Sequence, residues 1–212
     1  MVRKAVFTPE DVVAAGFRVL ARDGLAALSA RHVAEELGSS TAPVYSNFAT
    51  MDELSRAVKQ AVAEDLLEFT ARQFTDNAFL NIGLGVLEFA RQKPALYAAV
   101  FMQDGPECEV GPHVMARLGE RMAEVGQLRD LPLGEQLMLL HQMGIFTHGL
   151  AVQICAGLTK GFSFTDLTLM LEDAGQAMTC HALSRPQRSP AQLELMAALV
   201  AFKTQKDQYD GE

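Results

Sequence analysis

The chain has 212 residues, of which 49% are hydrophobic and none is tryptophan. This length and composition exclude a disordered chain and leave room for one large domain or two small ones. The net charge of −8 argues against nonspecific coating of nucleic acid, and it lies entirely beyond residue 60, because residues 1–60 carry seven basic and seven acidic side chains.

The N-terminus does not follow the pattern of a secretory signal. Arg3 and Lys4 are followed by Thr8-Pro9-Glu10-Asp11 and not by a long apolar stretch. No run reaches the roughly 18 uninterrupted apolar residues of a membrane span. Three cysteines without a C-x-x-C pair are expected to be reduced thiols: Cys108, Cys155 and Cys180. We therefore expect a cytoplasmic protein that has no contact with a membrane.

Two short helices are predicted at the start of the chain. Thr8-Pro9-Glu10-Asp11 places a capping hydroxyl before a proline and two acids, which is typical of a helix start. Asp23-Gly24 ends this first helix. Ser29 is expected to cap a second helix, and Gly38 ends it.

A third short helix follows almost at once. Ser40 or Thr41 is expected to cap it, and it runs through Phe48 with Pro43 in its first turn, where a missing N–H does least harm. Thr50-Met51-Asp52-Glu53 then reads as a capping box that opens a fourth helix. The tight glycine turn between the second and third helices predicts a helix-turn-helix.

Longer helices are predicted in the rest of the chain, where alanine and leucine abound and long alternating runs of Val, Ile and Thr are lacking. They cover residues 51–73, 78–92, 95–103, 113–127, 133–157, 165–183 and about 190–204, with loops at 104–112 and 184–190. The fold class is therefore predicted to be all-α.

The third helix of a helix-turn-helix lies in the major groove of DNA, so its exposed side chains are candidates for contact. Thr and Ser can bond to bases or phosphates, Ala42 can meet a thymine methyl, and Asn47 can read adenine. Tyr45 offers its hydroxyl to phosphate, although a purely structural role is the alternative. The candidate DNA-binding residues are Ser29, Arg31, Ser40, Thr41, Ala42, Tyr45, Ser46 and Asn47.

Residues 8–56 carry a family resemblance. The segments 28–38 and 40–48, followed by Met51-Asp52-Glu53-Leu54, resemble the DNA-binding domain of the TetR (tetracycline-repressor-like) regulators. The pair Tyr45 and Phe48 is the most specific part. The resemblance implies a homodimer with an all-α ligand-binding domain, usually a repressor that a small molecule releases from a DNA operator.

Two positions depart from the family pattern. The family often has Lys where this chain has Met51 and His where it has Ser46, so fewer contacts to the DNA backbone are expected. The implied organisation is a helix-turn-helix domain at residues 1–50 and a ligand-binding and dimerisation domain at residues 51–205. The partners expected are double-stranded operator DNA, an unknown small molecule and a second copy of the chain.

His141 and His148 share one face of a predicted helix. A shared metal ion is excluded by their separation of about 10 Å along the helix axis, at ~1.5 Å per residue. These histidines are instead expected to line a pocket or a dimer seam. The candidate ligand-binding residues are Phe69, Met102, Gln103, His141, Gln142 and His148.

The helices predicted at 133–157 and 165–183 are too apolar for a solvated surface. A buried central helix is one interpretation, and dimerisation through both helices is the one that we favour. No Ser-His-Asp pattern, glycine-rich phosphate loop or Glu-x-x-His pair is present, so no enzyme and no cofactor is expected. The alternative function is a helical adaptor that binds protein without binding DNA.

Overall fold

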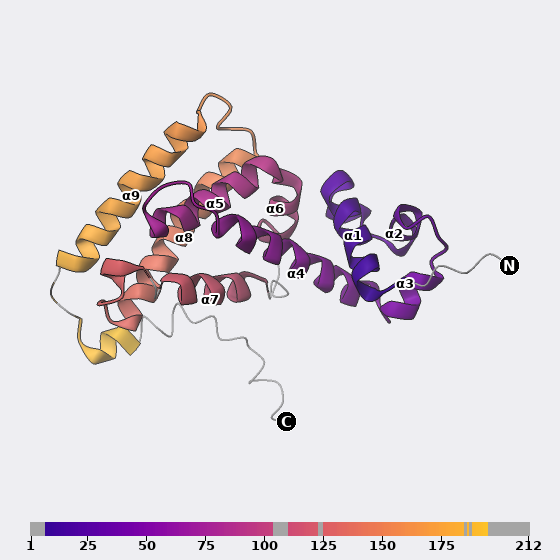
Figure 1. The fold of residues 1–212 in the computed structure, drawn as a ribbon, viewed down its shortest axis with the longest axis horizontal. Coiled ribbons are helices and arrows are strands. Elements are labelled where there is room, and N and C mark those ends of the chain that lie inside the picture. Colours follow the sequence, from indigo (N-terminus) through magenta and orange to yellow (C-terminus); the bar gives the residue numbers. More distant parts are fainter. Residues whose placement is uncertain (1–6, 104–109, 123–124, 185, 187, 195–212) are drawn as a thin grey trace.

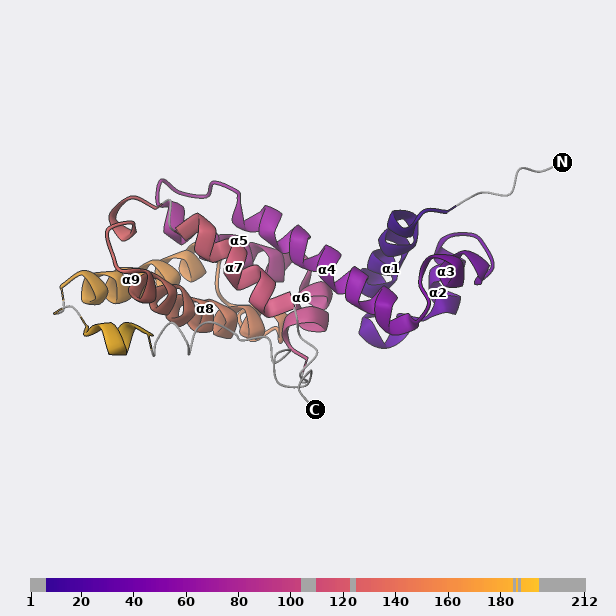
Figure 2. The ribbon, with the colours of Figure 1, turned by 90° about the horizontal axis from the view of Figure 1, so that it is seen from below.

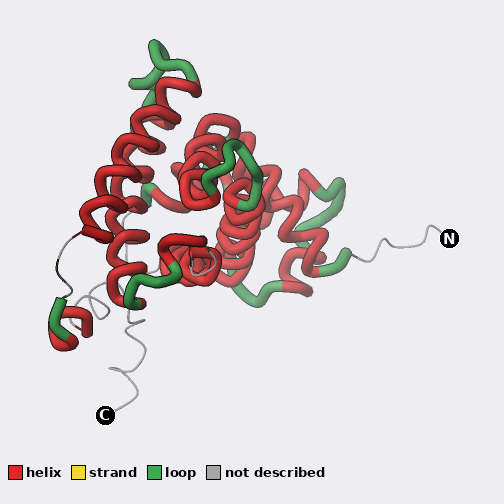
Figure 3. Tube along the Cα trace, turned by 60° about the vertical axis from the view of Figure 1, so that its left-hand side comes forward, coloured by secondary structure: helices red, strands yellow, loops and turns green. Residues whose placement is uncertain are grey.

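The fold was analysed in a computed structural model that describes residues 7–103, 110–122, 125–184, 186 and 188–194. Its helices are α1 (Pro9–Asp23), α2 (Ala30–Glu36), α3 (Ala42–Asn47), α4 (Met51–Thr70), α5 (Ala78–Gln92), α6 (Pro94–Phe101), α7 (Val110–Met122), α8 (Leu133–Cys155) and α9 (Phe164–Ser184). Two single 3₁₀ turns lie at Leu25–Ala27 and Gly126–Leu128. Figure 3 shows helices and loops only, and within these described ranges the all-α prediction is confirmed.

The head of the molecule, formed by α1, α2 and α3, lies at one end of an elongated shape (Figure 1). Thr8 and Asp11 form a complete capping box, with Thr8 N–H donating to Asp11 Oδ2 at 2.9 Å and Asp11 N–H donating to Thr8 Oγ1 at 3.3 Å. The helix ends at Gly24, whose φ of +82° suits glycine. Val19, Leu20 and Val33 are fully buried in the core of the head.

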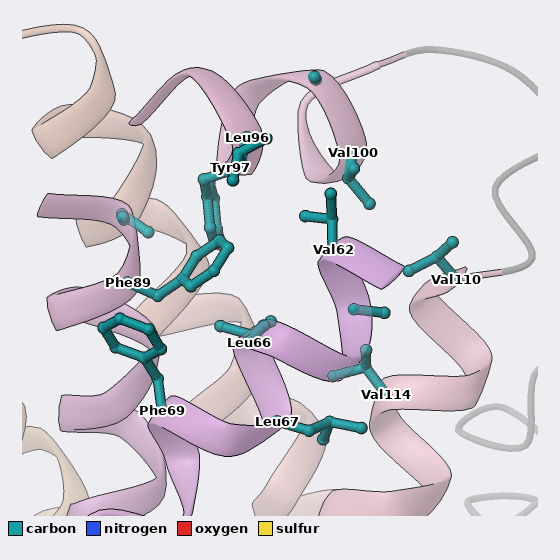
Figure 4. Close-up of a cluster of buried hydrophobic side chains, with 14 of the residues drawn as sticks. Val62, Leu66, Leu67, Phe69, Phe89, Leu96, Tyr97, Val100, Val110 and Val114 are labelled. Atoms are coloured by element: carbon teal, nitrogen blue, oxygen red, sulfur yellow. The ribbon is translucent and has the colours of Figure 1, made fainter. Parts of the chain in front are cut away.

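Helix α4 joins the head to the body, as Figures 1 and 2 both show. Its first half packs on α1, where Gly16 leaves room for the side chain of Val58. Its second half contributes Val62 and Leu66 to a core shared with α6 and α7 (Figure 4). One continuous helix therefore carries packing in both parts of the molecule.

Helix α5 crosses α4 at very close range. A Cβ at Gly85 would lie 2.5 Å from both the carbonyl oxygen of Phe69 and the Cα of Thr70. Phe69 packs edge-on against Phe89 of α5, with ring centroids 5.3 Å apart. The absence of a side chain at Gly85 thus sets the distance between these two helices.

Several helix ends differ from the predictions, for local reasons. The cap predicted from Ser40 or Thr41 is wrong, because Thr41 occupies the N-cap position of α3 in a helical conformation and its side chain makes no capping bond. Thr50 accepts from Glu53 N–H, but the Glu53 carboxylate reaches the N–H of Ala49 at 2.8 Å, so half of the expected capping box forms.

The later boundaries shift by a few residues. Helix α4 ends at Thr70 and not at residue 73, because its last turn tightens as Arg72 N–H bonds to Phe69 O. Helix α7 begins three residues earlier than predicted, because Pro112 fits in its first turn. The last predicted helix begins at residue 190, and its part beyond residue 194 lies outside the described residues.

Helix α8 runs through the body and packs against α5 and α9. It is the single helix in the described ranges that could cross a membrane by length and composition, and one third of its apolar window is buried within this chain. Its buried side chains, including Leu139 and Ala151, place it in the core of the helical body.

Candidate DNA interface and ligand cavity

The third helix of the head presents a polar, solvent-exposed surface. Thr41 and Ala42 are exposed at its start, and Tyr45 is 56% exposed one turn later. Val44 faces the other way and is buried. Because the Thr41 hydroxyl makes no capping bond, it is available to a partner outside the chain.

Two neighbouring candidates are already engaged inside the head. The Asn47 amide donates to Pro43 O at 2.8 Å and to Phe7 O at 3.1 Å, which uses both of its N–H donors. Ser46 Oγ donates to Pro43 O at 3.0 Å. Asn47 therefore ties the segment before α1 to α3, and reading adenine through its N–H groups would require breaking these bonds.

The remaining candidates lie beside α3 or at the start of α2. Ser29 caps α2 by accepting from His32 N–H at 3.4 Å. Arg31 is exposed, and its Nε lies 2.9 Å from the Glu35 carboxylate one turn along the helix. Ser40 is exposed in the turn before α3.

Two further arginines of the head are paired with one carboxylate. Arg18 Nε lies 2.7 Å from Glu36 Oε1, and Arg22 Nη1 lies 2.8 Å from Glu36 Oε2. The hydrogen bond from Arg18, followed by that from Arg22, lowers the pKa of Glu36 below its ordinary value. The cluster clamps α1 to α2. Glu36 is 18 positions from Arg18 and 14 from Arg22, so no short sequence pattern indicates that these residues pair.

A cavity of about 630 Å³ lies inside the body, in the size range of sites for drug-sized ligands. Helices α5, α8 and α9 form most of its wall, and α6, α7 and Leu66 of α4 contribute the rest. Most of its lining side chains are aliphatic or aromatic, for example Leu80, Val114 and Leu171.

A hydrogen-bonded pair stands in the wall of the cavity. Tyr97 Oη of α6 lies 2.8 Å from His148 Nδ1 of α8, and both residues line the cavity. Burial raises the pKa of the Tyr97 phenol, with a smaller effect from Cys155, and burial lowers the pKa of His148. Both side chains are consequently uncharged at neutral pH.

The structure brings together some of the predicted ligand-binding residues and separates others. His141 and His148 line the cavity. Phe69 is 2% exposed and packs in the core against Phe89, away from the cavity lining. Met102 and Gln103 follow the end of α6 at the surface, and Gln142 lies on a shallow surface depression of α8 and α9.

Most of the cavity residues were missed by sequence reasoning, among them Tyr97 and Thr147. Tyr97 lies among apolar neighbours in the sequence, and its hydrogen-bond partner is 51 positions away. Thr147 directly precedes His148 and is one turn beyond the Met143 that packs beside Gly175. Within the described ranges, no group of three or more His, Cys, Asp or Glu side chains is placed to hold a metal ion.

A physical link connects the cavity wall to the head. Helix α6 supplies Tyr97 to the cavity and also packs against α1 and α4. Just before α6, Lys93 Nζ lies 2.5 Å from Asp65 Oδ2 of α4 and 5.9 Å from the centroid of the Phe17 ring on α1. Movement of α6 would therefore change its packing against both α1 and α4.

Comparison with known proteins agrees with this architecture. Residues 12–58 match the family described as bacterial regulatory proteins, tetR family. The whole fold is similar to that of SCO7222, a TetR transcriptional regulator from Streptomyces coelicolor, with a TM-score of 0.57 and 20% identity over 92% of this chain and 98% of that one. The protein SCO4942 from the same organism gives a TM-score of 0.56 and 20% identity, over 81% of this chain and 98% of its own. No curated protein sequence matches the chain.

Proposed function

We propose that the chain is a DNA-binding transcriptional regulator that acts as a dimeric repressor released by a small molecule, because residues 12–58 match the tetR family of bacterial regulatory proteins. Each of two copies would place α3 in a major groove of a palindromic operator, with half-site centres roughly 34–36 Å apart. The exposed face of α3 carries this proposal, with Tyr45 and with Thr41, whose hydroxyl makes no capping bond. The site of action is the cytoplasm, where the operator DNA lies.

The DNA-binding part is tested by a gel shift with the intergenic DNA beside the gene. The double variant Thr41→Ala/Tyr45→Phe should bind at least tenfold more weakly, because two groups that reach base edges or phosphates are removed, at roughly 1 kcal/mol each. Thr165→Ala, which removes an exposed hydroxyl from α9, is the matched control and should bind as the parent does. Unchanged affinity of the double variant would refute the assignment of α3, and no specific shift at all would favour the adaptor alternative.

The proposed dimer is supported by apolar side chains left uncovered on α8 and α9. Ile145 is 62% exposed on α8, and Leu169 is 54% exposed on α9. Two thirds of the apolar window of α8 is not buried within one chain. Exposed apolar area of this extent on two long helices suits a four-helix contact with a second copy.

The proposed ligand response is supported by the cavity and its link to the head. A ligand that fits the cavity better in one position of α6 would shift the population toward that position. Because α6 packs against α1 and α4, the shift would change the spacing of the two heads and hence the affinity for the operator.

A further inference from the structure

The polar groups in the cavity wall restrict which ligands it accepts. Three elements of the wall matter: the hydroxyl of Thr147, the Tyr97–His148 pair, and the absence of lysine and arginine among the described lining residues. Each restricts the ligand in a different way. The inference drawn from them rests on the proposed ligand-responsive function and names the class of ligand.

The Thr147 hydroxyl borders the open space of the cavity. Thr147 is 4% exposed and lines the cavity, and no residue in the described part of the chain forms a hydrogen bond with its side chain. Its Oγ1 lies 3.4 Å from the point that a Cβ on Gly83 would occupy, so the small residue at that position keeps the space beside the hydroxyl open. A ligand that fills this space would cut the hydroxyl off from water, so a ligand that forms a hydrogen bond with it is favoured.

The Tyr97–His148 pair keeps a hydrogen-bond donor in either tautomer. If the phenol donates to His148 Nδ1, the imidazole carries its proton on Nε2 and can donate it onward. If His148 Nδ1–H donates to the phenol oxygen, the phenol proton itself stays available. In either tautomer the wall therefore offers two neutral donors, one from Thr147 and one from the Tyr97–His148 pair.

The described lining residues include two histidines, His141 and His148, and no lysine or arginine that could balance an anionic ligand. The single acidic lining residue, Glu172, is exposed on α9. Both members of the Tyr97–His148 pair are uncharged. Burying an anion or a cation without a buried partner is strongly unfavourable, which disfavours carboxylates, phosphates and ammonium compounds alike.

We propose that the cavity takes an uncharged lipophilic molecule that carries a hydrogen-bond-accepting oxygen, such as a ketone, ester or lactone. Its apolar body lies among the aliphatic and aromatic side chains of α5, α7 and α9, and its oxygen accepts from Thr147 and from the Tyr97–His148 pair. Charged molecules of the same size and shape are excluded.

The test is a fluorescence titration of the full chain, without DNA, using the uncharged naphthalene ketone prodan. Two charged counterparts serve as competitors, one with a carboxylate in place of the propionyl group and one with a trimethylammonium in place of the dimethylamino group. Prodan should bind with a blue-shifted emission. Each charged counterpart should compete with prodan at least tenfold more weakly than an uncharged naphthalene ketone of the same size does.

Three variants locate the binding. Tyr97→Phe/Thr147→Val should weaken prodan binding by about fivefold or more, because it removes the Thr147 hydroxyl and the phenol that either donates to the ligand or fixes the His148 tautomer that does. Thr165→Val, a matched loss of a hydroxyl outside the cavity, should leave binding unchanged. Gly144→Leu should abolish it, because the new side chain projects from the cavity face of α8 near Met115. Thermal unfolding by circular dichroism verifies that each variant folds.

The proposal is overturned if a charged counterpart competes as well as a neutral one, if Gly144→Leu binds prodan normally, or if the double variant binds as tightly as the parent. Because DNA takes no part in the titration, these outcomes are independent of the gel shift. A chain that binds prodan as expected but gives no operator shift contradicts the proposed function and leaves the nature of the cavity established.

Discussion

The contact at Gly85 predicts a measurable loss of stability on adding one methyl group. In Gly85→Ala the new Cβ would lie 2.5 Å from backbone atoms of Phe69 and Thr70, where ordinary contacts are 3.4–4 Å, so α4 and α5 must separate by about 1 Å. Such overpacking costs about 1–3 kcal/mol, and the gain in helix propensity returns about 0.5–1 kcal/mol. The atoms in the way belong to a helix backbone and cannot rotate aside, so we expect a net loss of about 2 kcal/mol.

The measurement is thermal unfolding at one fixed protein concentration, because association makes Tm concentration-dependent. A loss of about 2 kcal/mol lowers Tm by roughly 4–8 °C in a chain of this length. Gly119→Ala on α7 is the matched control, since its Cβ would meet only the side chains of Leu137 and Leu140, at 3.8 Å. It should raise Tm by about 1–4 °C through helix propensity. A Gly85→Ala protein that melts at or above the parent Tm would refute the close crossing.

Three further predictions concern charge and assembly. Glu36→Gln should lower Tm at pH 7. Because the pKa of Glu36 is lowered in the folded state, the difference in Tm between parent and variant should shrink as the pH falls below about 4.5, which melting at a series of pH values measures. His148→Gln should change how the denaturant midpoint depends on pH. Because burial lowers the pKa of His148 below 6.5, the parent should lose stability relative to this variant as the pH falls through 6.5. Parallel pH profiles of the two proteins would contradict the buried neutral imidazole. Leu169→Asp should convert the proposed dimer to a monomer in analytical ultracentrifugation, while Thr165→Asp on the same helix should not, and a dimer that survives Leu169→Asp would argue against α9 as the contact.

The sequence was most informative where structure is decided locally. The capping box at Thr8, the glycine stops and the short third helix depend on neighbours within a few residues, and the family pattern around Tyr45 and Phe48 covers the same stretch. The all-α class and most helix bounds followed from the same local signals. The cap predicted at Thr41 failed because the turn before α3 already holds a helical conformation there.

The cavity could be predicted only in part, because it depends on which helix faces meet. His141 and His148 were found because they share one face of one helix. Tyr97 was missed because only the packing of α6 on α8 brings its hydroxyl to His148. Phe69 was misplaced as a candidate because periodicity identifies an apolar face without distinguishing a cavity wall from the core.

The pairing of Arg18 and Arg22 with Glu36 has a consequence for how the head would search for its operator. Each phosphate that a protein neutralises releases condensed counterions and adds about 0.9 to the slope of log affinity against log salt. Arginines already paired with a carboxylate of their own chain add little to that release, and Arg31 is paired in the same way with Glu35. If the head binds DNA as proposed, it would hold random DNA weakly and leave it quickly. Its residence at the operator would then depend on the base sequence under α3 and would vary little with intracellular salt.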